Sequence, residues 1–168
     1  MRSIDLLVIH HSETLGGNID FLRYCHVTPP PKGNGWMDVG YHYTIANGKK
    51  HYAWEAAGDG YVEEGRPEKN VGAHARGFNE HSIGICLIGD FENTYPTNLQ
   101  LASLVELLIK LCLKYDIDPM KGIRTHGELM ETKCPGKNLQ HLIPTIRQAV
   151  RLRIDHQKRI NKAIEGLG

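Results

Sequence analysis

The segment Ile83–Gly89 constrains the fold more than any other part of the sequence. Its residues read Ile-Gly-Ile-Cys-Leu-Ile-Gly, so they are almost all apolar and several are β-branched. A strand that is buried on one face alternates apolar and polar residues, whereas an unbroken apolar run indicates a strand covered on both faces. Such a strand requires a sheet with further elements packed on each side. This is the arrangement of α/β domains.

Other segments supply the remaining elements. Period-two alternation predicts strands over residues 4–12, 39–46 and 123–126. Apolar periodicity behind capping residues predicts helices over residues 18–27, 97–115 and from 138 onward, with Pro144 tolerated in a first turn. We therefore expect one α/β domain over residues 1–168, with a central mixed β-sheet flanked by helices. Its core is expected over residues 4–140, followed by a C-terminal helical extension over residues 141–168.

Three connecting segments carry turn or loop signals. Asn47-Gly48 is a strong tight-turn signal, and it predicts a hairpin that joins the preceding strand to His51–Trp54. The three prolines and two glycines of residues 28–35 predict an irregular loop. Residues 127–136 are also predicted to form a loop.

Charge and hydropathy exclude several classes of function. Lys and Arg number 20 against 19 Asp and Glu, so the net charge of +1 argues against a general nucleic-acid binder. The apolar stretch at the N-terminus is short and contains Asp5, which predicts neither a signal peptide nor a membrane span. We expect a monomer made in the cytoplasm, with no nucleic-acid partner and no integral membrane contact.

The C-terminal helix carries an excess of positive charge. Between Arg147 and Lys162 there are six cations and one anion, Asp155. A solvated helix face is the favoured interpretation, and contact with an anionic cell-wall or membrane surface is the alternative.

Histidines are unusually frequent, with ten in 168 residues. His10 and His126 lie at the ends of predicted strands, and Cys134 follows in the loop before Pro135-Gly136. Sites in α/β sheets are built at such strand ends. Two imidazoles and one thiolate would leave a fourth tetrahedral position open on zinc, as catalytic sites do. From spacing alone, two core histidines and a core cysteine remain the competing interpretation.

Five blocks, in order along the chain, carry a resemblance to a known family. They are Val8–Ser12, Gly35–Tyr43, Val71–Asn79, Ser82–Gly89 and Thr125–Gly136. Together they resemble the zinc-dependent N-acetylmuramoyl-L-alanine amidases of the type 2 class, which include amidase-type phage lysozymes and peptidoglycan recognition proteins. The resemblance extends over roughly residues 4–140.

This resemblance implies a set of site residues. It implies that His10, His126 and Cys134 hold Zn²⁺ and that Tyr41 is the active-site tyrosine. His11 would point away from the metal. The family has lysine or threonine two positions before the last ligand; here Thr132 occupies that position and Lys133 follows, so which of the two assists the transition state stays open.

Four further residues of the matched blocks are candidates for substrate binding. His74 and Asn79 would line the peptide groove or, alternatively, stabilise their loop. Trp36 would stack on a sugar or close the core. Arg76 would meet a stem-peptide carboxylate or simply be a solvated arginine.

The resemblance also implies a function. It predicts a zinc-dependent hydrolase that cleaves the amide bond between N-acetylmuramic acid and L-alanine in peptidoglycan, as an endolysin of phage or prophage origin does. Without a signal peptide, such an enzyme would reach the cell wall by another release route. The alternative is a non-catalytic recognition module that binds muropeptides on the same fold; an open zinc site together with Tyr41 favours the enzyme.

Overall fold

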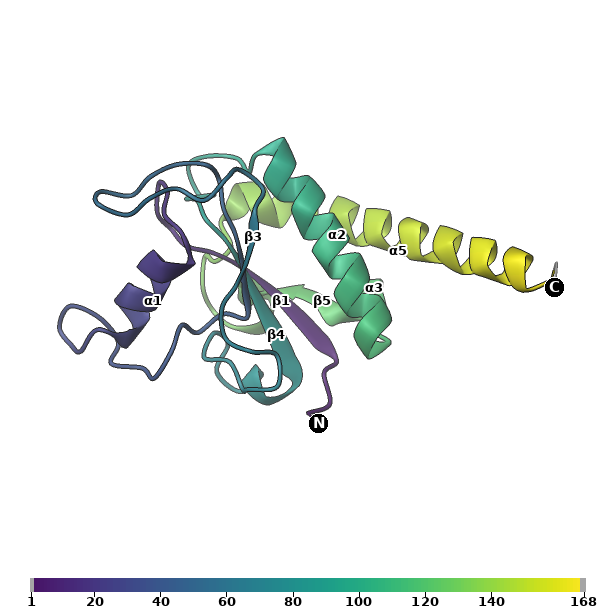
Figure 1. Cartoon of the computed structure of the whole chain (residues 1–168). Helices are drawn as coiled ribbons and strands as arrows, with labels where there is room; N and C mark the ends of the chain where they lie inside the picture. Colours follow the sequence, from purple (N-terminus) through teal and green to yellow (C-terminus); the bar gives the residue numbers. More distant parts are fainter. Residues whose placement is uncertain (1, 167–168) are drawn as a thin grey trace.

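The computed structural model describes residues 2–166 (Figure 1). Its elements, in chain order, are β1 (Leu6–His11), α1 (Ile19–Val27), β2 (Tyr43–Ile45), β3 (Val62–Glu64), the 3-10 turn η1 (Asn79–His81), β4 (Ser82–Leu87), α2 (Asn98–Tyr115), α3 (Pro119–Gly122), β5 (Ile123–Thr125), α4 (His126–Leu129) and α5 (Lys137–Glu165).

The strands form one mixed sheet in the order β3-β2-β4-β1-β5. β4 lies in the middle and pairs in parallel with both β1 and β2, β5 pairs in parallel with β1, and only β3 runs antiparallel to its neighbour β2. Every residue of β4 is buried. The expectation of an α/β domain with a central mixed sheet is confirmed.

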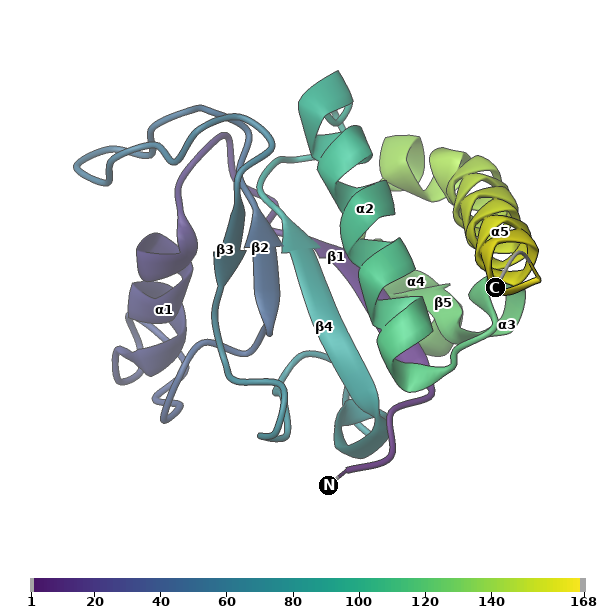
Figure 2. The same cartoon turned by 45° about the vertical axis from the view of Figure 1, so that its right-hand side comes forward.

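Helices cover the sheet on both faces (Figures 1 and 2). The larger apolar cluster joins α2 and α5 to one face of the sheet, where Leu7 and Ile9 of β1 lie beside Ile83 and Ile85 of β4. A smaller cluster on the other face joins α1 to Cys86. His10 and Cys86 are register partners in the parallel pair β1–β4, so the side chain of His10 faces away from α2 and α5.

Side-chain caps fix where the first two predicted helices begin. The Asn18 side chain accepts a hydrogen bond from the backbone N–H of Phe21, and α1 starts there. At α2, Thr97 and Gln100 form a reciprocal capping box. Each cap satisfies backbone donors that the first helical turn leaves without a partner.

The predicted hairpin is wrong in its second strand. β2 pairs with β3 rather than with His51–Trp54, and the ladder continues where the Ala46 N–H donates to the Tyr61 carbonyl. His51 and Trp54 bridge only to each other. Asn47-Gly48 does turn the chain, but the residues after it pack on the first helix, with the rings of His51 and Phe21 4.3 Å apart. Contact with α1 therefore overrides the pairing that the turn signal favours.

Two local predictions at the C-terminal side also need correction. α5 begins at Lys137, directly after Gly136, so Pro144 lies beyond the first turn. Pro144 is exposed, and water can replace the N–H donor that proline lacks there. The predicted loop over residues 127–136 contains most of α4, because Thr125 and Glu128 form a second capping box.

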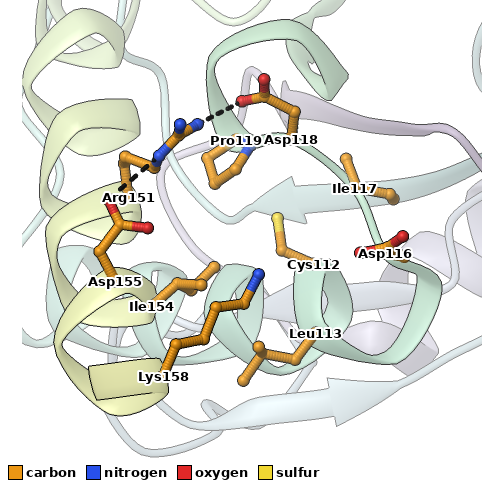
Figure 3. Close-up of a pocket in the computed structure, with 10 residues that line it drawn as sticks. All are labelled: Cys112, Leu113, Asp116, Ile117, Asp118, Pro119, Arg151, Ile154, Asp155 and Lys158. Atoms are coloured by element: carbon orange, nitrogen blue, oxygen red, sulfur yellow. Dashed lines mark hydrogen bonds and ion pairs between the residues drawn. The ribbon is translucent and has the colours of Figure 1, made fainter. Parts of the chain in front are cut away.

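Three of the six cations between Arg147 and Lys162 form ion pairs with carboxylates. Arg147 pairs with Glu128, Arg151 with both Asp118 and Asp155, and Arg153 with Glu106. The Arg151 pairs border a cavity of about 300 Å³ between the end of α2, α3 and α5 (Figure 3). None of the predicted site residues lines this cavity. Among residues 2–166 no helix is long and apolar enough to cross a membrane.

Candidate metal centre

Three side chains converge at the C-terminal edge of the parallel strands. His10 is the second-to-last residue of β1. His126 follows β5 directly, and Cys134 lies in the loop before α5. Because β1 and β5 run in parallel as neighbours, their ends lie side by side. The ligand atoms of His10, His126 and Cys134 all lie within 4.8 Å of one another. The residues that sequence analysis picked out as a ligand set are therefore close together in the fold.

The spacing of these atoms fits a tetrahedral metal ion. Nδ1 of His10 lies 3.7 Å from Sγ of Cys134, and the rings of His10 and His126 have centroids 4.6 Å apart. Zinc bonds of about 2.0–2.1 Å to nitrogen and about 2.3 Å to sulfur place the two atoms about 3.6 Å apart in a tetrahedral site. Imidazole and thiolate are also donors that zinc prefers. The donor set and its geometry therefore suit this metal.

Burial sets the protonation of the three side chains. The pKa of His10 lies well below its usual value because the ring is desolvated, and neighbouring histidines lower it further. Desolvation also lowers the pKa of His126. The same cause raises the pKa of the Cys134 thiol to about 12. At neutral pH both imidazoles are thus neutral and able to ligate, while the thiol would have to lose its proton to solvent in order to bind a metal as a thiolate.

Tyr41 lies next to this cluster. Its ring centroid is 5.1 Å from that of His10 and 5.5 Å from that of His26. Burial raises the pKa of the Tyr41 hydroxyl well above its usual value, and the thiols of Cys86 and Cys134 raise it further. The hydroxyl therefore keeps its proton at neutral pH and can act as a hydrogen-bond donor.

Thr132 and Lys133 lie at the surface beside the cluster. The Thr132 hydroxyl oxygen accepts a hydrogen bond from the backbone N–H of Cys134 at 3.2 Å, which leaves its own proton available for another acceptor. Both residues border a hollow of about 350 Å³ that also includes Cys134. The hollow adjoins the ligand set and offers space for part of a substrate.

His74 and Asn79 make contacts within the protein. The Asn79 side-chain oxygen accepts hydrogen bonds from the backbone N–H groups of His74 and Ala75, at 3.0 and 2.9 Å. These are the contacts of a loop-stabilising residue. The His74 ring is only 9% exposed and lies behind His10, with Nδ1 of His74 3.1 Å from Nε2 of His10.

Trp36 and Arg76 lie farther out. Trp36 is 37% exposed and its ring lies 4.8 Å from that of His26, which in turn neighbours Tyr41. Arg76 is exposed, and within residues 2–166 its side chain forms no ion pair. Among the described residues, neither forms a hydrogen bond or a ring contact with His10, His126 or Cys134.

Sequence reasoning did not pick out some of the residues around the cluster. His26 closes one side of Tyr41 and accepts a hydrogen bond from the Gly40 N–H. Ser82 lies 3.4 Å from His74. His11, which the resemblance predicts to point away from the metal, faces the opposite side of the sheet and accepts a hydrogen bond from the Phe91 N–H. Strand alternation could have placed Ser82 on the same face as Gly84 and Cys86. No local pattern marks the contact of His26.

His42 is a second buried histidine behind the cluster. Its Nδ1 accepts from the Gly84 N–H at 3.0 Å, so the proton is on Nε2, which donates to the Asn70 carbonyl. The pKa of His42 is lowered to about 4, mainly because the ring is desolvated; Arg2 and Arg66 also lower the pKa, whereas the hydrogen bond to the Asn70 carbonyl and the charge of Glu68 raise it.

This shift predicts a loss of stability in acid. Between pH 6.5 and 4 the unfolded chain binds a proton at His42 and the folded chain does not, so the free energy of unfolding falls as pH falls. From pH 7 to 4.5 we expect His42 to account for a loss of about 2 kcal/mol. Urea unfolding of the chelator-treated protein at both pH values measures it, with His42→Asn as the comparison. An equal acid loss in both proteins would contradict the prediction.

Comparison with known proteins places this arrangement in a family. A family profile described as N-acetylmuramoyl-L-alanine amidase matches residues 1–137. The endolysin of Escherichia phage T7 is 35% identical over 147 residues, which cover 83% of this chain and 85% of that protein.

Solved structures show the same similarity. The N-acetylmuramoyl-L-alanine amidase LysC from Clostridium intestinale is 28% identical, with a TM-score of 0.66 over 86% of each chain. A mutant of Drosophila PGRP-LB in complex with tracheal cytotoxin is 26% identical, with a TM-score of 0.67 over 84% of this chain and 81% of that one. The profile match takes in every strand of the sheet and all three clustered side chains. The chain therefore belongs to the N-acetylmuramoyl-L-alanine amidase family.

Proposed function

We propose that the protein hydrolyses the amide bond between N-acetylmuramic acid and L-alanine in peptidoglycan, with Zn²⁺ held by His10, His126 and Cys134. The observation that carries this proposal is the convergence of these three side chains, within 4.8 Å, beside the half-buried Tyr41. Family membership and the T7 endolysin similarity support the choice of substrate. The tracheal-cytotoxin complex of a structural neighbour supports recognition of muropeptides.

Zinc bound to these residues would acidify a water molecule and polarise a carbonyl group. Hydrolysis adds water across the lactyl carbonyl, breaks its C–N bond, and yields a free sugar and a peptide that begins with L-alanine. The protein contributes hydrogen-bond donors to this step. Tyr41 keeps its proton and would donate to the oxygen that becomes negatively charged. Thr132, at the edge of the hollow, would donate a second hydrogen bond to the same oxygen.

The outer candidates would then contribute to substrate binding. Trp36 is partly exposed beside His26 and would stack on a sugar ring. Arg76 is exposed and would pair with a carboxylate of the stem peptide. Asn79 would act through the loop that it stabilises. The enzyme would act on the cell wall as an endolysin does.

Metal removal tests the proposal. Incubation with purified muropeptides, followed by mass spectrometry, is expected to show free sugar and intact peptide beginning at L-alanine. A chelator should reduce this release to the level of the no-enzyme control, because in this proposal the bound zinc is what acidifies the attacking water. One equivalent of Zn²⁺ should restore it.

Two outcomes would contradict parts of this proposal. Release that persists in the chelated, metal-free protein would show that the metal is not needed for hydrolysis. Unchanged muropeptide in the presence of zinc-loaded protein would favour the non-catalytic recognition module. Binding of the same fragments would then be measured by calorimetry.

A further inference from the structure

A buried chain of polar groups leads away from the candidate metal centre. The His10 ring presents Nδ1 toward the Cys134 sulfur, 3.7 Å away, and Nε2 toward Nδ1 of His74, 3.1 Å away. Nε2 of His74 lies in turn 3.4 Å from the Ser82 hydroxyl. The exposed fractions of His10, His74 and Ser82 are 1%, 9% and 0%. Little water can therefore reach these nitrogens, and they depend on one another for hydrogen bonds.

This series of hydrogen-bonding groups determines which ring nitrogens of His10 and His74 carry protons. If Nδ1 of His10 binds a metal, the only proton of its neutral ring is on Nε2. That N–H must donate, and the atom that faces it is Nδ1 of His74. His74 then accepts at Nδ1 and carries its own proton on Nε2, where the Ser82 oxygen is the acceptor. One set of tautomers thus satisfies both rings and leaves Nδ1 of His10 free for the metal.

The position of the His74 ring is fixed by its surroundings. Its backbone N–H is held by the Asn79 side chain. A Cβ atom at Gly84 or Gly72 would come within 2.5 and 2.6 Å of Cδ2 of His74. Only glycine at these two positions leaves room for the ring. The two glycines therefore leave a space that the imidazole ring of His74 occupies and that a larger residue at either position would close.

We propose that His74 is a positioning residue for the metal centre, which accepts a hydrogen bond from Nε2–H of His10 and thereby holds His10 with Nδ1 toward the metal. The inference rests on the proposed function, since it needs a metal bound by His10. It assigns His74 to the metal centre in place of the peptide groove. Partners of this kind typically change metal affinity or activity by about 10–100-fold when they are removed.

Substitutions at His74 separate positioning from simple packing. His74→Leu fills the space and removes both ring nitrogens. His74→Asn keeps an acceptor, because its side-chain oxygen is the same number of bonds from Cα as Nδ1 of histidine. The zinc Kd, measured by competition with a chromophoric chelator, is expected to rise about 10–100-fold in His74→Leu. It should return most of the way to the wild-type value in His74→Asn.

The absorption spectrum of the Co²⁺-loaded protein is a measurement that a change in packing alone would not alter. The visible absorption bands of the Co²⁺-loaded protein report ligand geometry, and we expect them to change in His74→Leu but not in His74→Asn. His42→Asn is the matched control, since it removes a buried histidine that packs edge-on against His74, with ring centroids 5.7 Å apart, but provides no acceptor for Nε2–H of His10. Its zinc Kd should stay at the wild-type value. If His74→Leu does not fold, Ser82→Ala is expected to weaken zinc binding severalfold by removing the partner of His74.

The outcomes distinguish this inference from the proposed function. A wild-type protein that binds no zinc overturns both. A wild-type protein that binds zinc, with a folded His74→Leu variant that matches its Kd and cobalt spectrum, overturns only the role of His74. An equal loss of affinity in His42→Asn also overturns it, because any buried histidine would then have the same effect.

Discussion

Replacement of the thiol in Cys134→Ala is expected to abolish zinc binding and amidase activity together. Cys134 is one of the three ligand side chains in the cluster. As a thiolate it is the one that would carry a negative charge, which would offset the positive charge of the metal. Structural zinc sites in zinc-finger peptides bind with about 10–16 kcal/mol at neutral pH, and on that scale the loss of one ligand in three costs about 4 kcal/mol. This corresponds to about a thousandfold increase in the zinc Kd. Metal content after gel filtration and product release from muropeptides measure the two effects.

Cys112→Ala is the control for this substitution. Cys112 is a buried thiol in α2, within the apolar cluster on the opposite face of the sheet. Its removal should lower the free energy of unfolding by about 1 kcal/mol and leave zinc content and activity unchanged. If Cys134→Ala behaved in the same way, with metal retained and only stability reduced, Cys134 would be a core thiol and not a ligand.

Removal of the Tyr41 hydroxyl is expected to have the second largest effect. Tyr41→Phe keeps the ring that packs on His10 and His26, and removes only the proton donor. Loss of one donor to a developing oxyanion typically lowers kcat by about 10²–10³-fold. Because the hydroxyl is outside the ligand set, zinc content and muropeptide Kd should not change. Single-turnover cleavage of a purified muropeptide gives the rate constant, and calorimetry gives the Kd.

Tyr43→Phe is the matched control, since it removes the hydroxyl of a second tyrosine two residues farther along the chain. That hydroxyl donates to Glu68, on the face of the sheet away from His10. We expect Tyr43→Phe to lose about 1 kcal/mol of stability and to keep its kcat. Full activity in Tyr41→Phe would remove Tyr41 from the mechanism. An unchanged kcat with a raised KM would instead show that its hydroxyl only binds the substrate.

Much of the fold follows from patterns that act over short distances along the chain. The apolar run of residues 83–89 requires burial on both faces, and the observed strand β4 is wholly buried. Capping by Asn18 and Thr97 starts two helices at the predicted residues. The hairpin failed because the partner of β2 was decided by packing on α1 and not by the turn alone.

The candidate site was likewise predictable from the sequence only in part. Strand-end position and the five sequence blocks picked out His10, His126 and Cys134, and the fold brings them together although 124 positions separate the first from the last. The direction of His74 could not be predicted from the sequence. A loop residue with small neighbours is equally consistent with a groove, and only the packing of the loop against β4 turns its ring toward His10.

The sequence by itself therefore determined the α/β class, the starts of the main helices, and which residue types could hold a metal. These depend on backbone preference, capping and burial, which are set by neighbours along the chain. Only the tertiary structure decided which strands pair, which histidine stands behind the ligand set, and which ring nitrogen faces the Cys134 sulfur. These depend on contacts between distant segments, whose relative positions are fixed only when the helices and the sheet pack together.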